Sequence, residues 1–323
     1  MIFIEAFRTT FGAILELVLL GAVGFYLIKR RLLSDEGLGM LSNLVIGLFL
    51  PCFMFAEIFK KFTLSLYPDW WIFPLYSVLV SAAGLVLGLV FLRADKDLPK
   101  DREEFLSITT FQNSGYLPLP LVASLLPADT AQQMFIYIFL FLLGFNMTIF
   151  SFGSWLLCNK KDACRFDFKH MFNAPVIATL AALACVFLNI SRFLPGVVFD
   201  PIDLLGRCAI PLSILVVGGN LAALKTNGRS YAKPVAWGLL IKLAVLPLLF
   251  LWLVVLMKPK PLVGLLLVLQ ATMPPATLLS IISKAKEREG SLINQAIFYG
   301  HLISIVTIPL FLALYWIFAK TFY

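Results

Sequence analysis

Apolar stretches long enough to cross a lipid bilayer follow one another along almost the whole sequence. A transmembrane helix needs about 20 mostly apolar residues. Ten stretches meet that requirement, at residues 9–29, 38–59, 70–92, 104–126, 132–157, 172–190, 201–224, 233–256, 262–283 and 291–318. Hydrophobic residues make up 60% of the 323-residue chain and charged residues only 14%, against roughly 25% charged residues in soluble proteins. We therefore expect an all-α membrane protein with ten transmembrane helices.

The ten stretches divide into two halves of five. Because five is odd, the second half must enter the membrane from the opposite face, which predicts two inverted five-helix repeats. We place them at residues 1–157 and 172–323, joined by a cytoplasmic linker at 158–171. Prolines of the two halves correspond at offsets of 155 to 160 residues: Pro51 with Pro211, and Pro118 and Pro120 with Pro274 and Pro275.

The distribution of positive charge predicts the orientation. Most of the 26 Lys and Arg residues fall in the loops on one side, with dense groups at Lys29–Arg31, Arg93–Arg102 and Lys160–Lys169. Cytoplasmic loops of membrane proteins carry an excess of Lys and Arg, so both termini are expected to be extracytoplasmic. The net charge of +8 is then explained by these loops, and we expect no nucleic-acid partner.

Two of the apolar stretches are interrupted, each the fourth of its half. The first contains Asn113-Ser114-Gly115-Tyr116-Leu117-Pro118-Leu119-Pro120, and the second contains Gln270-Ala271-Thr272-Met273-Pro274-Pro275. Broken helices persist at membrane depth only when they are buried in protein or line a cavity. Paired interruptions in matching places indicate the substrate site of a secondary transporter.

The chemistry of the interruptions predicts an anion site. A new half-helix begins after each proline break, and its free N–H groups and dipole attract negative charge. We therefore expect the polar groups of Asn113, Ser114, Gln270 and Thr272 to contact a carboxylate. The alternative is that they only cap carbonyl groups that the prolines leave unpaired.

Lys242, His301 and Asn146 are polar residues near the middle of their apolar stretches. Lys242 is nine residues into the eighth stretch, near the bilayer centre at a rise of about 1.5 Å per residue. It would bind the substrate carboxylate, or act as a built-in cation that holds the broken carbonyl ends, or merely line a wet cavity. His301 corresponds to Asn146 at an offset of 155 residues, so we expect both around the site. Because histidine titrates near neutral pH, His301 is the candidate for proton coupling, with a packing role as the alternative.

Arg207 has a different environment, because it follows Asp203 by four residues. A structural ion pair with Asp203, or with Glu16 of the first stretch, is one interpretation, and recruitment of anions is the other. The sequence has no HExxH, GxSxG, P-loop or dinucleotide-binding motif. We therefore expect no enzyme activity, no cofactor and no metal site. Neither interruption contains a carboxylate, which argues against tight sodium coupling.

Several short motifs, taken in order, resemble those of the auxin efflux carrier family. They are Gly24–Ser34 with Leu48–Cys52, Asn113–Tyr116 with the following prolines, Pro211–Ser213 with Gly218–Gly219, Met273–Ala276, and Thr307–Leu310. The resemblance covers essentially the whole chain. It implies ten helices in two inverted repeats, in which the broken helices 4 and 9 cross each other. It also implies a scaffold of spans 1, 2, 6 and 7, a moving unit of the other six spans, and a homodimer. It also implies that Asn113 contacts the substrate.

The short central loop favours the bacterial branch of that family, the malate and malonate permeases of the inner membrane, over the plant auxin exporters. We therefore expect a secondary active or potential-driven transporter of small organic carboxylates that works by an elevator motion. A sodium-coupled symporter of the bile-acid type and a non-transporting membrane sensor are the alternatives.

Overall fold

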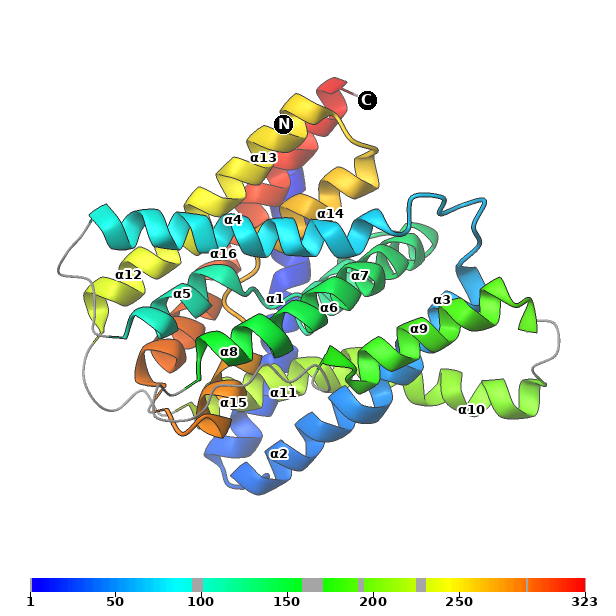
Figure 1. Cartoon of the computed structure of the whole chain (residues 1–323), viewed down its shortest axis with the longest axis horizontal. Helices are drawn as coiled ribbons and strands as arrows, with labels where there is room; N and C mark the ends of the chain where they lie inside the picture. The colour runs from blue at the N-terminus through cyan, green and yellow to red at the C-terminus, as the bar shows by residue number, and fades with distance from the viewer. Residues whose placement is uncertain are drawn as a thin grey trace.

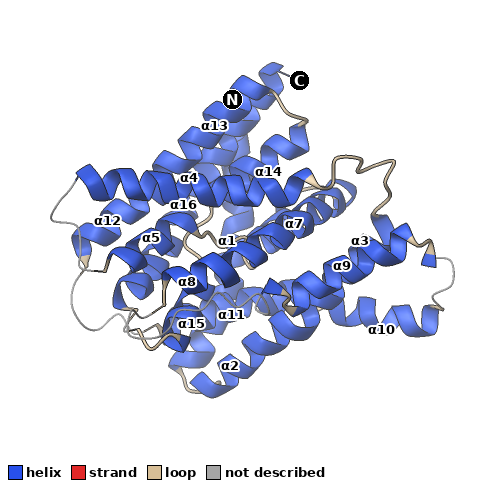
Figure 2. Ribbon diagram, in the orientation of Figure 1, coloured by secondary structure: helices blue, strands red, loops and turns tan. Residues whose placement is uncertain are grey.

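A computed structural model gives the structure of the chain at residues 2–94, 101–158, 171–190, 195–224, 231–288 and 290–322. This part of the chain consists of helices and connecting loops (Figure 2). Its only β-type pairing is an isolated antiparallel bridge between Gln112 and Pro275. Most of the expected linker, at 159–170, lies outside the described residues.

Within the described ranges, seven long helices have the length and apolar composition needed to cross a membrane. Three are single elements: α1 (Ile2–Lys29), α4 (Ile72–Ala94) and α16 (Ser291–Phe322). Three contain a π-helical segment: α2 (Asp35–Leu44) with η1 (Val45–Phe49) and α3 (Leu50–Lys61); α7 (Ala128–Thr148) with η2 (Ile149–Gly153) and α8 (Ser154–Leu156); and α12 (Ala232–Leu240) with η5 (Ile241–Val245) and α13 (Leu246–Met257). The seventh consists of α10 (Gly196–Arg207) and α11 (Ala209–Ala223).

The other three expected spans have shorter helices. The sixth stretch contains α9 (Ala174–Phe187). The fourth is divided into α5 (Arg102–Thr110) and α6 (Pro118–Leu125), and the ninth into α14 (Pro261–Thr272) and α15 (Leu278–Ala285). Both predicted interruptions are confirmed at residues 111–117 and 273–277, which are non-helical, but their predicted bounds are wrong because Pro118 and Pro120 begin α6, and Gln270 and Thr272 end α14.

The distribution of polar and apolar side chains is the reverse of that in a soluble protein. Large apolar side chains such as Leu19, Trp252 and Leu256 are about 60% exposed, whereas Lys242 and Gln270 are fully buried. Large exposed apolar surfaces mark contact with a membrane or a partner, and a polar group inside a membrane protein normally faces its interior. The chain is therefore an integral membrane protein.

Helices far apart in the sequence pack against one another (Figure 1). α1 contacts α11 and α16, α3 contacts α9 and α10, and α4 contacts α5 and α7. α1 and α11 cross at backbone contact, because a Cβ on Gly218 would overlap the carbonyl group of Gly21. Such small-residue crossings are typical of membrane helices, and this one brings α1 and α11 together next to the broken helices.

Candidate functional site

The two helix interruptions meet and pair through their backbones. The Asn113 amide donates to the Pro274 carbonyl at 2.8 Å, and the Ala276 amide donates to the Phe111 carbonyl at 3.1 Å. Gln112 faces Pro275 in the antiparallel bridge between these bonds. Two unwound segments at membrane depth thus satisfy part of each other's backbone hydrogen bonding, which the hydrocarbon could not do.

The prolines explain where each helix stops and restarts. Pro118 and Pro120 lie in the first turn of α6, where a missing N–H costs no helical hydrogen bond. Met273 precedes Pro274 and is extended, as the steric demand of a following proline favours. α15 then begins after Thr277.

Gln270 and Thr272 lie in the last turn of α14 and are fully buried. The Gln270 side-chain amide donates to the Ser114 carbonyl at 3.2 Å, so it links the two interruptions. The Thr272 hydroxyl donates to the Leu269 carbonyl within its own helix at 2.7 Å. Among the described residues, neither side chain is part of the wall of the central cavity. Their contact with a substrate stays a prediction.

Lys242 lies in the π-helical segment η5 and is fully buried. Its ammonium donates to the Thr109 carbonyl at 3.2 Å, to the Thr110 carbonyl at 3.3 Å and to Gln112 Oε1 at 3.2 Å. The two carbonyls end α5, where backbone oxygens lack helical partners and carry partial negative charge. The three donors of the ammonium are thus matched by three acceptors.

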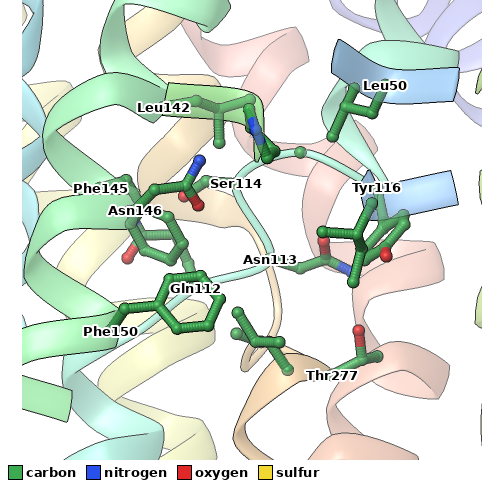
Figure 3. Close-up of a pocket in the computed structure, with 15 residues that line it drawn as sticks. Leu50, Gln112, Asn113, Ser114, Tyr116, Leu142, Phe145, Asn146, Phe150 and Thr277 are labelled. Carbon is green, nitrogen blue, oxygen red and sulfur yellow. The ribbon is translucent and has the colours of Figure 1, made fainter. Parts of the chain in front are cut away.

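A cavity of about 60 Å³ lies where the two interruptions cross. It has room for a few water molecules. Asn113, Ser114 and Asn146 line it, together with Gln112, Tyr116 and Thr277, which sequence reasoning missed. Figure 3 shows Asn146 and Ser114 on one side of this cavity and Tyr116 on the other, with the rings of Phe145 and Phe150 near Asn146. No acidic residue is among the described residues that line it.

A second, mostly apolar cavity of about 220 Å³ lies between α1, α11 and α16. His301 lines it, and Tyr116 borders both cavities. The His301 ring reaches the first interruption, because Asn113 Nδ2 lies 3.3 Å from His301 Nε2. His301 Nδ1 lies 2.8 Å from the Ile297 carbonyl oxygen. Asn146 and His301 thus line one cavity each, with Asn113 linking His301 to the first.

Arg207 lies apart from this site. Its guanidinium donates twice to the Asp203 carboxylate, at 2.9 and 3.2 Å, and Lys60 pairs with the same carboxylate at 2.9 Å. Glu16 instead accepts a hydrogen bond from the Ser124 hydroxyl. Of the two partners considered for Arg207, the structure shows Asp203. Since the Arg207 side chain is 73% exposed, this ion pair is a surface feature.

The family described as "Membrane transport protein" matches residues 9–162 and 155–312. The chain belongs to this family, that of the auxin efflux carriers. It is 23% identical to an uncharacterized transporter of Methanothermobacter thermautotrophicus over 96% of this chain and 98% of that protein. It is 22% identical to PIN-LIKES 1 of Arabidopsis thaliana over 94% of this chain and 78% of that protein.

A shorter match links the chain to an uncharacterized transporter of Schizosaccharomyces pombe, with 30% identity over 34% of this chain. The chain spans about a quarter of the length of that protein and of PIN-LIKES 2 of Arabidopsis thaliana. The family is described as one of membrane transport proteins, and the matched proteins of Schizosaccharomyces pombe and Methanothermobacter thermautotrophicus are named as transporters. The chain therefore belongs to a family of membrane transport proteins.

Proposed function

We propose that this transporter carries small organic anions, mono- or dicarboxylates such as malate or malonate or auxin-like acids, and binds them at the crossing of the two interrupted helices. The observation that carries the proposal is the central cavity. Its polar lining consists of amide and hydroxyl groups, without a carboxylate among the described residues. Behind it lies the buried ammonium of Lys242.

The electrostatics of the cavity favour a negative guest. The first turn of α15 borders it through Thr277 and Leu278, and helix N-termini attract anions through their free N–H groups and dipole. The Lys242 ammonium adds a positive charge close to the cavity. Gln112 lies between the two, because it accepts a hydrogen bond from the ammonium and also lines the cavity. The carboxylate would thus be held by Asn113, Ser114 and Asn146 in a positive potential.

The proposed motion follows from where the cavities lie. We propose that ten membrane spans form two inverted repeats. A scaffold consists of α1, α2–α3, α9 and α10–α11, and a moving unit contains both interruptions. Residues of both the scaffold and the moving unit line each cavity. In the first, Leu50 and Pro175 are scaffold residues and Asn146 belongs to the moving unit. In the second, Leu17 and Val217 are scaffold residues and His301 belongs to the moving unit. An elevator motion of one unit against the other would open the site to each side in turn.

The membrane potential contributes about 2.3 kcal/mol per charge per 100 mV, which aids export of an anion from a negative interior. Import would need a proton or a counter-anion, and His301 is the proposed proton carrier. We place the protein in a bacterial inner membrane as a homodimer with both termini extracytoplasmic.

Sodium coupling is the main alternative, and the contacts of Lys242 argue against it. Na⁺ prefers oxygen ligands, as hard cations do. Three oxygens at the first interruption already accept hydrogen bonds from the Lys242 ammonium. A fixed cation at this position makes a second, exchangeable one electrostatically unfavourable.

Carboxylate flux into proteoliposomes tests the proposal. We expect accumulation of malate or malonate without sodium, and its loss in the double variant Asn113→Ala, Lys242→Ala. Accumulation that the double variant leaves unchanged would refute the site. Strict sodium dependence would favour the symporter.

A further inference from the structure

The contact between Asn113 and His301 determines which end of the Asn113 amide is free. His301 Nδ1 lies 2.8 Å from the Ile297 carbonyl oxygen, which can only accept. Nδ1 therefore carries the ring proton, and Nε2 of the neutral ring is an acceptor. Asn113 Nδ2 donates to that lone pair at 3.3 Å. The opposite amide orientation would place Asn113 Oδ1 against the Nε2 lone pair, acceptor against acceptor.

Protonation of His301 reverses which end of the Asn113 side-chain amide can face Nε2. The imidazolium has N–H groups at both ring positions, so Nε2–H would face the two donors of the Asn113 NH₂ group. The contact becomes favourable again when the Asn113 amide turns over and its oxygen accepts from Nε2–H. Its NH₂ group is then free for the central cavity that Asn113 lines.

We infer that His301 sets the hydrogen-bonding polarity of Asn113, and that carboxylate binding at the site thereby favours protonation of His301. The inference rests on the proposed function and deepens it, because it assigns His301 a positioning role and selects the charged form of the substrate. A hydronium ion of the aqueous phase gives its proton to His301 Nε2 and becomes water, the Asn113 side-chain amide turns over, and its NH₂ group donates to a carboxylate oxygen. When the anion leaves, Nε2 returns the proton to the aqueous phase.

The ionisable side chains on the helices around α16 lie away from the His301 ring, so a positive charge on that ring acts mainly on Asn113. The elements packed against α16 carry these ionisable side chains: Glu5, Arg8, Glu16, Tyr26 and Lys29 on α1; Arg102, Glu103 and Glu104 on α5; Lys233 on α12; Lys242 on η5; and Lys284 on α15. None of them lines the His301 cavity in the part of the chain that the structure describes, and only Tyr116 from the interruption does. Lys242 is engaged at the end of α5.

The coupling is reciprocal by linkage. If the carboxylate binds about tenfold more tightly to the protonated state, which is within the usual range of coupling between sites, then bound carboxylate moves the His301 titration up by about one pH unit. A neutral ligand of the same shape gains nothing from the reversal of Asn113. It should leave the titration unchanged.

Nitrogen NMR of the imidazole can read this directly, because the chain has only two histidines, His170 and His301. The experiment uses full-length His170→Asn protein in lipid nanodiscs with ¹⁵N-labelled histidine, titrated alone, with malonate and with malonamide. We expect Nδ1–H and a bare Nε2 at high pH, an upward shift of about one pH unit with malonate, and no shift with malonamide. Asn113→Leu should abolish the malonate shift, whereas the control Ser304→Ala, in the same cavity, should keep it.

Three results would overturn the inference. One is a ligand-free ring that carries its proton on Nε2 at high pH. Another is malonate binding that leaves the His301 titration unchanged. The last is an equal malonate shift in Asn113→Leu. If no carboxylate among malonate, malate, lactate and phenylacetate raises the melting temperature of the protein, the proposed function fails as well, whereas failure of the inference alone leaves that binding intact.

Discussion

Replacing Lys242 by methionine should destabilise the crossing of the interrupted helices. The substitution keeps most of the side-chain volume but removes the ammonium from the Thr109 and Thr110 carbonyls and from Gln112. Hydrogen bonds of a charged group contribute about 1.5–3 kcal/mol each, so the three together contribute about 4.5–9 kcal/mol. Removing the ammonium also removes its desolvation cost of several kcal/mol. We expect a net loss of about 3 kcal/mol.

A loss of that size should lower the apparent melting temperature by about 5 °C in a chain of this length. The assay is thermal unfolding in lipid nanodiscs, with Lys284→Met as the control, because Lys284 is an exposed lysine in the last turn of α15. The melting temperature of Lys242→Ala should be lower still. Added methylammonium should restore part of the stability of this variant while leaving the melting temperature of the wild type unchanged. A Lys242→Met protein that melts with the wild type, or methylammonium without effect on Lys242→Ala, would refute the reasoning.

Three other substitutions probe the surroundings of the site. Gly84→Ala should reproduce the Lys242→Met defect, because a Cβ there would overlap the Thr109 carbonyl oxygen that the ammonium binds; melting equal to wild type would contradict this. Asn146→Leu should raise the KM for carboxylate about tenfold, the loss of one hydrogen bond to a charged group, with little change in melting temperature; an unchanged KM would remove Asn146 from the site. Arg207→Gln should lower the free energy of unfolding by less than about 1 kcal/mol, because exposed ion pairs contribute little, and transport at low salt should be unchanged. A salt-dependent rise in KM would instead indicate that Arg207 recruits anions.

Sequence alone predicted the helix interruptions, because proline acts through local backbone geometry. Pro118 begins α6, and Pro274 and Pro275 follow the end of α14. The three π-helical segments η1, η2 and η5 were not predicted, since one extra residue in a turn leaves no mark in an apolar sequence. Two of them line the central cavity, through Ile46 and Phe150, and the third contains Lys242.

The direction of side chains in the unwound segments was the part that sequence could not supply. Helical periodicity is lost there, so nothing indicated that Gln112 lies against Lys242. Nor could the sequence indicate that the unwound segment brings the Ser114 carbonyl to Gln270, which lies in the last turn of α14. For Lys242 the possible roles could be named, because a buried ammonium needs acceptors. Choosing among them needed the three-dimensional contact between the eighth stretch and the end of α5.

Counterflow in proteoliposomes tests the central claim most directly, because it requires binding and reorientation but no driving force. Vesicles loaded with unlabelled malate or malonate and containing the wild-type protein should accumulate the labelled acid from outside. The double variant Asn113→Ala, Lys242→Ala should not, while Lys284→Met should behave as the wild type. Equal accumulation by the double variant, or none by the wild type with any small carboxylate, would contradict a carboxylate site at the crossing of the two interrupted helices.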